Sequence, residues 1–152
     1  MRRVQLRTYN IIASLNQDLV IEGSFIEWLS AQVSRWENVH MLSTKLWDSE
    51  FQHSVLENVV FDAVDLRGVS FREAKLVNVT FRNAKMMDMS FRGARLQGVK
   101  FENTTCQICD FSGADMGDTQ MDLPFQKASF SLGTRLPFPY EQVGKYGFEL
   151  RD

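Results

Sequence analysis

The sequence lacks several features that would assign a function class directly. No run of 18 apolar residues occurs, which excludes an ordinary membrane-spanning helix. Polar residues from Gln5 to Asn10 interrupt the apolar stretch that a cleaved signal peptide would need. The formal net charge of -2 implies no global electrostatic partner. We therefore expect a soluble, cytoplasmic protein, with export by a route that needs no cleaved signal as the alternative.

Histidine and cysteine are scarce, and this scarcity limits the chemistry available. His40 and His53 lie far upstream of Cys106 and Cys109, which form a single C-x-x-C motif. Such a motif can be a redox pair or half of a metal site, but no second C-x-x-C exists to complete a zinc site. The favoured interpretation is two small core residues. We expect no catalytic residue, no cofactor and no metal ion.

The sequence does contain an internal repeat of five residues. Counting in fives from Met41, every position through Met121 is apolar or cysteine. The residue two places earlier in each quintet is usually small or β-branched, and most other positions are polar or glycine. An α-helix has a period of 3.6 residues and an ordinary strand a period of two, so neither sustains this beat. A solenoid does, if each quintet forms one short side of a coil.

The quintets AKLVN (74–78), AKMMD (84–88), ARLQG (94–98) and ADMGD (114–118) resemble the pentapeptide-repeat family, whose consensus is roughly A-(D/N)-(L/F)-x-x. The match covers at least residues 39–121. The resemblance implies an all-β fold, a right-handed quadrilateral parallel β-helix with four quintets per coil and terminal caps. Glycines and asparagines two places after the quintet centre fall where the chain should turn.

Four sides per coil place every twentieth residue in one column. Neighbouring coils lie about 4.8 Å apart, so like side chains should stack on like. The phenylalanines are therefore predicted to be core, not a cofactor box or a nucleic-acid stacking platform. The predicted walls are Phe61, Phe81 and Phe101; opposite them Phe51, Phe71, Phe91 and Phe111; then Leu56, Leu76, Leu96 and Met116; and finally Leu66, Met86 and Cys106.

Three segments are predicted: an N-terminal strand or cap over residues 1–20, the β-helix over 21–121 (clearest from 39) and a C-terminal tail over 122–152. Residues 24–36 leave two interpretations open. The repeat can continue upstream, or a capping box at 24–27 can open a short helix. Continued repeat is favoured. In the tail, prolines at 124, 137 and 139 break the pattern, and one further quintet centred on Phe130 is shifted by one residue.

The tail keeps an aromatic character that a disordered tail would not have. The favoured interpretation is a plug over the last coil, because the end of a solenoid exposes apolar core and strand edges. The alternative is an interface with a partner or with a second copy in a homodimer, since aromatic residues are enriched at such surfaces. The candidate interface residues are Phe138, Tyr140, Tyr146 and Phe148.

Charge is zoned along the predicted axis. Residues 17–57 hold seven acids and two bases, residues 58–101 four acids and eight bases, and residues 102–122 five acids and no base. Spacing by 20 residues stacks Asp62, Arg82 and Glu102 in one column and Asp65 over Lys85 in another. These columns are predicted to be intramolecular ion ladders, each pair weak at a solvated surface.

Four cations are less well compensated, and we name them the basic corner: Arg72, Lys75, Arg92 and Arg95. Arginine stacks over arginine and lysine over arginine around one corner, and only Glu73 and Asp115 are placed to offset them. Like charges in register are unfavourable. The basic corner is therefore the candidate partner-binding set, and an ordinary solvated face is the alternative.

A solenoid with a filled core offers no pocket by default, so we expect a non-enzymatic protein. The leading hypothesis is a protein-binding or scaffold protein, and the resemblance implies a bacterial secreted effector or regulator as one branch. The resemblance also implies an alternative, a DNA mimic that binds and protects a type II topoisomerase such as gyrase, although its middle coils are basic where such mimics are acidic. A third hypothesis is binding of an anionic surface or nucleic acid through the basic corner, with nucleic acid the less favoured partner.

Overall fold

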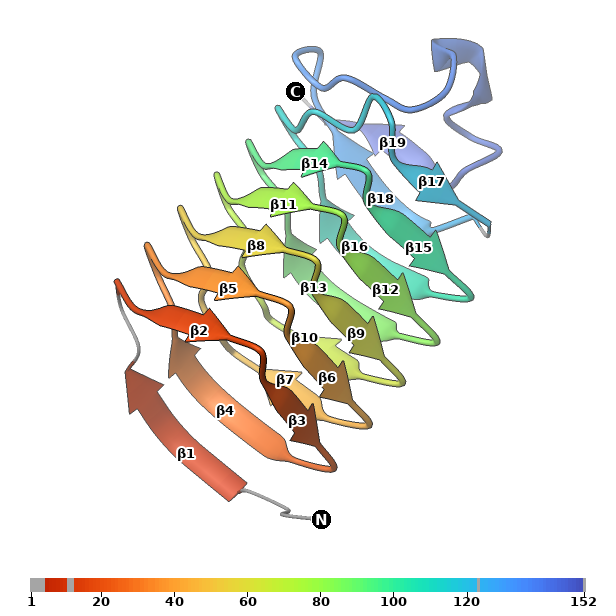
Figure 1. The fold of residues 1–152 in the computed structure, drawn as a ribbon. Helices are drawn as coiled ribbons and strands as arrows, with labels where there is room; N and C mark the ends of the chain where they lie inside the picture. Colours follow the sequence, from red (N-terminus) through yellow and green to blue (C-terminus); the bar gives the residue numbers. More distant parts are fainter. Residues whose placement is uncertain (1–4, 11–12, 123, 152) are drawn as a thin grey trace.

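The computed structural model describes residues 5–10, 13–122 and 124–151, which wind as a parallel β-solenoid (Figure 1). Most quintets contribute a three-residue strand followed by a turn. Three walls of the coil are hydrogen-bonded sheets, and the fourth wall is linked by isolated bridges that join Ser30, Glu50, Ser70 and Ser90. The predicted quadrilateral parallel β-helix is confirmed.

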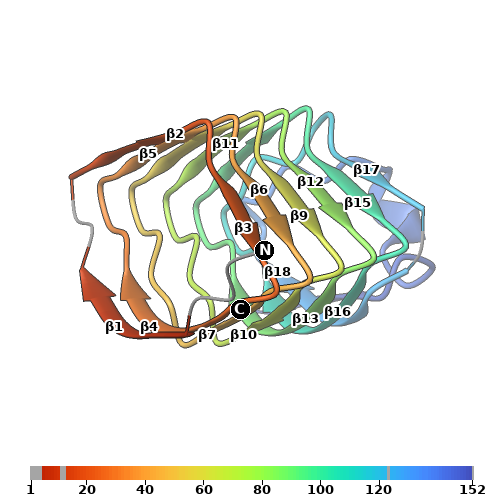
Figure 2. The same cartoon turned by 60° about the horizontal axis from the view of Figure 1, so that its bottom comes forward.

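The three sheets run along the solenoid axis, and neighbouring sheets meet at the corners of the coil (Figure 2). Sheet A contains, in order, β1 (Gln5–Asn10), β4 (Phe25–Ser30), β7 (Lys45–Trp47), β10 (Asp65–Arg67), β13 (Lys85–Ser90), β16 (Thr105–Asp110), β18 (Gln126–Phe130) and β19 (Phe148–Leu150). Sheet B contains β2 (Leu15–Gln17), β5 (Arg35–Glu37), β8 (Val55–Glu57), β11 (Lys75–Val77) and β14 (Arg95–Gln97). Sheet C contains β3 (Val20–Glu22), β6 (His40–Leu42), β9 (Val60–Asp62), β12 (Thr80–Arg82), β15 (Lys100–Glu102) and β17 (Gln120–Met121).

The register confirms the predicted columns of 20 residues. Phe81, for example, pairs with Phe61 on one side and Phe101 on the other. Its ring stacks on both neighbours, with centroids 4.9 and 5.1 Å apart, and meets Phe71 of the opposite wall edge to face at 6.2 Å. Because Phe51, Phe61, Phe71 and the later members of both walls are fully buried, the phenylalanines are core, as predicted.

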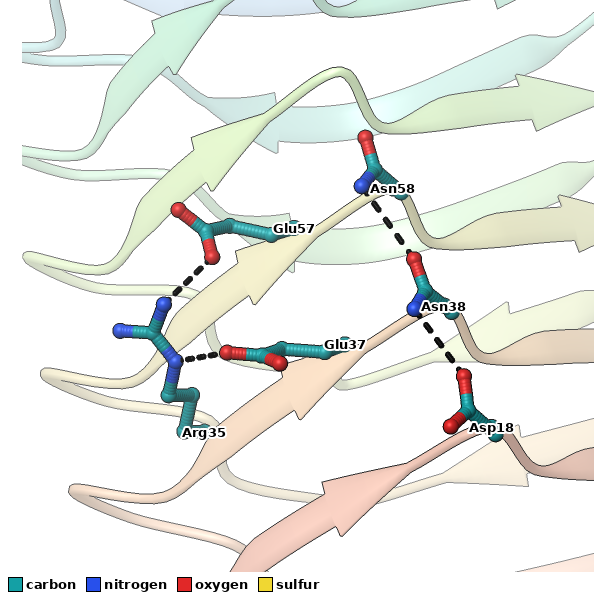
Figure 3. Close-up of polar contacts among 6 residues, drawn as sticks. All are labelled: Asp18, Arg35, Glu37, Asn38, Glu57 and Asn58. Atoms are coloured by element: carbon teal, nitrogen blue, oxygen red, sulfur yellow. Dashed lines mark hydrogen bonds and ion pairs between the residues drawn. The ribbon is translucent and has the colours of Figure 1, made fainter.

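The corners are closed by residues in the left-handed region. All seven glycines and asparagines that the repeat predicts as turn residues have positive φ: Gly68, Asn78, Asn83, Gly93, Gly98, Asn103 and Gly113. On the corner between sheets B and C, Asn38 donates to Asp18 at 3.0 Å and Asn58 donates to Asn38 at 3.2 Å (Figure 3). Asn78 continues this ladder, and a Cβ at Gly98 would lie 2.8 Å from the Asn78 amide oxygen, so only glycine fits there without displacing it.

The upstream segment belongs to the solenoid. β4 and β5 cover most of residues 24–36, so this segment is repeat and not helix. β1 pairs with β4 in the same register, and Ile26 and Trp36 are buried at the predicted centres. Of the predicted N-terminal strand or cap, residues 1–4 and 11–12 lie outside the described residues.

The C-terminal tail covers the end of the solenoid opposite β1 (Figure 1). β18 pairs with β16 at a spacing of 19 residues, which accounts for the one-residue phase shift in the sequence. A short 3-10 helix, η1 (Tyr140–Gln142), leads to β19, whose Phe148 is buried against Phe111, Phe125 and Phe130. The tail therefore packs as a plug over the last coil.

Cys106 and Cys109 both point into the core and are essentially unexposed, as predicted for two small core residues. Their sulfurs are also joined in a disulfide across the corner, which the sequence did not predict. In the described part of the chain, no helix is long and apolar enough to span a membrane.

Candidate partner-binding surface

The basic corner lies where the fourth wall turns into sheet B. Arg72 and Arg92 point outward from the fourth wall, and Lys75 and Arg95 are direct partners in the β11–β14 pair. All four side chains are exposed. The turn between the two pairs is made by Glu73 in one coil and by a glycine in the next, both with positive φ. The structure thus brings the four predicted residues together on two successive coils.

The four cations differ in compensation. Arg72 forms an ion pair with Glu73 at 3.5 Å, and the same carboxylate lies 3.4 Å from a nitrogen of His53. Lys75, Arg92 and Arg95 form no ion pair within the described ranges. The predicted offset by Asp115 is wrong, because this carboxylate is paired instead with Arg135 of the tail at 3.4 Å. Three of the four cations therefore face solvent without a counter-charge.

Elsewhere, exposed cations are paired. Arg82 donates to Asp62 at 2.8 Å, which confirms the predicted ladder; this contact lowers the pKa of the Asp62 carboxyl and raises the pKa of Arg82. The predicted Asp65–Lys85 pair is in register, but Asp65 pairs with Arg67 on its own strand at 3.0 Å. The two acceptors in β9 and β10 thus satisfy arginines, while the basic corner has none.

The acidic section near the N-terminus shows the same compensation. Arg35 donates to Glu37 on its own strand and to Glu57 on the next coil, the latter at 2.6 Å (Figure 3). The hydrogen bond and charge of Glu37, followed by the charge of Glu57, raise the pKa of Arg35. One cation therefore serves two carboxylates that would otherwise stack as like charges on sheet B.

Two shallow polar grooves flank the basic corner. The first, on the sheet B side, has a volume of about 460 Å³ and is lined by Lys75, Arg95, Leu96, Gln97, Asp115, Gly117, Asp118 and Arg135. The second, which we name the fourth-wall groove, has a volume of about 350 Å³ and is lined by Arg92, Asp110, Ser112, Gly113, Ser131 and Arg151. Both grooves contain a cation that the tail supplies.

Sequence reasoning missed Arg135 and Arg151. Arg135 follows Asp115 in the Lys75–Arg95 column through an isolated bridge, and Gly117 leaves room for its guanidinium, since a Cβ there would lie 2.6 Å from it. Arg151 is positioned by β19, and its N–H donates to the carbonyl of Phe130. The 20-residue spacing between positions 115 and 135 was a usable signal. The phase shift before β18 concealed the other.

An outward aromatic cluster on sheet A was also missed. The ring of Phe25 meets Trp47 edge to face at 4.9 Å, and the Arg67 guanidinium lies 4.8 Å from the Trp47 ring centre. The Trp47 indole nitrogen is buried without a hydrogen-bond partner among the described residues. Cation–π contact and aromatic packing explain why these side chains gather on one wall.

The four aromatic residues proposed as an interface in the tail are divided by the structure. Phe138 and Tyr146 stack at 4.3 Å and are packed against the core, together with buried Phe148. Tyr140 is 56% exposed. Only one of the four is therefore presented to solvent over most of its surface.

The surface offers binding chemistry of one kind. The described residues contain no group of three histidine, cysteine, aspartate or glutamate side chains that could hold a metal ion. The two grooves are open and lined mainly by charged and polar groups. Exposed guanidinium and ammonium groups without counter-ions attract carboxylate or phosphate groups.

Comparison with known proteins agrees with the fold. A sequence model described as a pentapeptide repeat region matches residues 33–111 and 57–130, together more than half of the chain. HetL, involved in heterocyst differentiation regulation in the cyanobacterium Nostoc, superposes with a TM-score of 0.71 at 16% identity; the match covers 84% of this chain but only 62% of HetL. QnrB1, a plasmid-mediated fluoroquinolone resistance protein, gives a TM-score of 0.53 at 12% identity over 95% of this chain and 92% of QnrB1. No curated protein sequence matches.

Proposed function

Because this chain belongs to the pentapeptide-repeat family, we propose that it is a non-catalytic scaffold that binds another protein on the outer surface of its β-helix. The observation that carries the proposal is the basic corner, where Lys75, Arg92 and Arg95 have no ion pair in the described part of the chain. An acidic patch on a partner would supply the missing counter-charges. Complementary charge of this kind favours fast association and a fixed orientation.

The β-helix suits this role because its surface is organised before the partner arrives. Register fixes Lys75 beside Arg95, one coil spacing of about 4.8 Å apart. The Phe71 and Phe91 rings beneath the fourth wall stack at 5.4 Å and hold its two coils together. A rigid display lowers the ordering cost of binding, so even a polar surface can bind specifically.

The test compares two variants with equal loss of charge. The corner variant replaces Arg72, Lys75, Arg92 and Arg95 by glutamine. The control variant replaces four exposed lysines on other parts of the surface by glutamine: Lys45, Lys85, Lys100 and Lys127. After crosslinking in cells that express the chain natively, we expect a specific protein to be captured by the wild type and the control but not by the corner variant. Equal capture by both variants would move the interface elsewhere.

DNA mimicry of a type II topoisomerase substrate is the alternative function. The similarity to QnrB1 concerns the fold alone, and cations stand on the middle coils where a mimic needs anions. A supercoiling assay with purified gyrase separates the two proposals. Inhibition or protection by this chain would support mimicry, and no effect at excess protein would remove it. Retention on anionic vesicles or heparin, lost in the corner variant alone, would instead support an anionic surface as the ligand.

The tail is proposed as a second contact surface, for a homodimer. Tyr140, Leu132 and Leu150 expose apolar area at the plugged end of the solenoid. Light scattering of the full chain and of its Tyr140→Ala variant tests this. A dimer that dissociates in the variant supports the interface, whereas a monomeric full chain leaves the tail as a plug only. A role as a bacterial secreted effector would be one setting for a scaffold of this type.

A further inference from the structure

One outward column of the fourth wall continues from the basic corner into the tail. The column runs from Arg72 and Arg92 to Ser112, Ser131 and Arg151. Two small hydroxyl residues therefore lie between one arginine on the repeat and another on the tail. The fourth-wall groove lies over these serines and is lined by the arginines on both sides.

Register and hydrogen bonds establish this column. Asp110 pairs with Ser129, and Ser129 pairs with Glu149, so positions two residues further along continue in line. The N–H of Gly113 donates to the Ser131 hydroxyl at 3.1 Å, which places the two coils in contact at this height. The one-residue shift before β18 thus brings serine over serine and the tail arginine beyond them.

The donors in the groove are unoccupied. Arg92 and Arg151 form no ion pair with the described residues, and the Ser112 hydroxyl forms no hydrogen bond with them. The hydroxyl of Ser131 accepts from Gly113 and lies 3.5 Å from the Thr134 hydroxyl. Two planar guanidinium forks and a free hydroxyl face one concave floor. Such forks bind anionic oxygens in pairs.

Negative groups nearby limit the site without filling it. Asp110 lines the groove, but one of its oxygens already accepts the Ser112 N–H at 2.9 Å and lies 3.4 Å from the Ser129 hydroxyl. Glu73 stands one coil back and is engaged by Arg72 and His53. Neither carboxylate forms an ion pair with the two arginines of the groove.

From this juxtaposition we propose that the fourth-wall groove is a seat for a phosphate monoester, carried by a phosphorylated side chain of the bound partner. Two forks and the Ser112 hydroxyl supply more donors than the two oxygens of a carboxylate can use, whereas a phosphate monoester presents three strong acceptor oxygens and a charge near -2. The source of the phosphate rests on the proposed scaffold function. Recognition of the group itself does not.

The first experiment uses inorganic phosphate as the probe. Full-length protein labelled with ¹⁵N is titrated with phosphate, and amide shifts are compared with a sodium chloride titration of equal ionic strength. We expect phosphate alone to shift Ser112, Gly113 and Ser131 in a saturable way. Arg92→Gln and Arg151→Gln should each weaken binding at least tenfold, while Arg95→Gln, on the other side of the corner, should not.

Shifts that chloride reproduces, or that both groove variants retain, would overturn the proposal. Arg92→Lys keeps the charge but removes the fork, and it should still weaken binding several-fold; unchanged binding would also count against the seat. An unchanged spectrum away from the groove confirms that each variant is folded.

The second experiment uses peptides that differ only in one phosphoryl group. A phosphoserine peptide should shift the same three amides and the unphosphorylated serine peptide should not, and equal effects of the two would contradict the proposal. Phosphate binding without any captured protein partner would leave the seat in place and reject the scaffold function. A captured partner with no phosphate effect would do the reverse.

Discussion

Arg92 provides a direct test of whether the basic corner is uncompensated. Arg92 stands one coil from Arg72 and three residues from Arg95, and it has no acidic partner in the described structure. Two unit charges about 6 Å apart repel by roughly 0.7 kcal/mol in the dielectric of bulk water. The Debye length is about 30 Å at 0.01 M salt and about 3 Å at 1 M, so this repulsion is almost fully expressed at low salt and screened at high salt.

Replacing Arg92 by glutamine should therefore stabilise the protein at low salt. We expect the free energy of unfolding in urea to rise by about 0.5–1 kcal/mol at 0.01 M salt, with most of the gain lost at 1 M. The matched control is Arg82→Gln, which removes a cation paired with Asp62 at 2.8 Å and should change low-salt stability in the opposite direction. If Arg92→Gln is destabilising at low salt, Arg92 makes a stabilising native contact and the reasoning about an uncompensated corner fails.

Three further predictions concern the fold that carries the site. Phe81→Ala, which empties a fully buried position between two stacked rings, should cost about 3–5 kcal/mol in urea unfolding, and Phe81→Leu should cost less; equal costs would contradict the stacked-wall account. The hydrogen bond from Arg82 lowers the pKa of Asp62 below its usual 3.8, so its stabilising contribution is complete above about pH 4 and is lost as the pH falls through the lower folded-state pKa. Asp62→Asn should flatten this acid part of the stability curve, and an unchanged curve would show that the pair does not matter. Thiol titration of the unfolded, unreduced chain should find no free cysteine, and reduction should lower stability by about 2 kcal/mol, the value for closing so short a loop; two free thiols would disprove the disulfide.

The inward half of this structure could be predicted because a single register determines it. Once Phe81 is assigned to the core, every fifth residue follows, and Ile26 and Trp36 extend the same count upstream. Turn residues such as Gly98 follow as well, because the corner needs a left-handed backbone. Periodicity therefore determines the core and the position of each outward column.

The outward half could be predicted only in part. Register places Lys85 beside Asp65, but side-chain rotamers decide that Asp65 pairs with Arg67 instead. The disulfide depends on how two inward side chains meet across a corner, which spacing alone does not specify. Arg151 enters the candidate site because the repeat loses one residue before β18, and a fixed count cannot follow that shift.

The central claim, that a partner binds at the basic corner through charge, is tested most directly by the salt dependence of the partner's affinity. Dissociation constants of the captured partner are measured at several salt concentrations for the wild type, for the corner variant and for the variant that lacks four other lysines. The account predicts that affinity falls steeply with salt for the wild type and the lysine control, and that the corner variant binds weakly with a much flatter dependence. Equal affinity and equal salt dependence in all three proteins would contradict it.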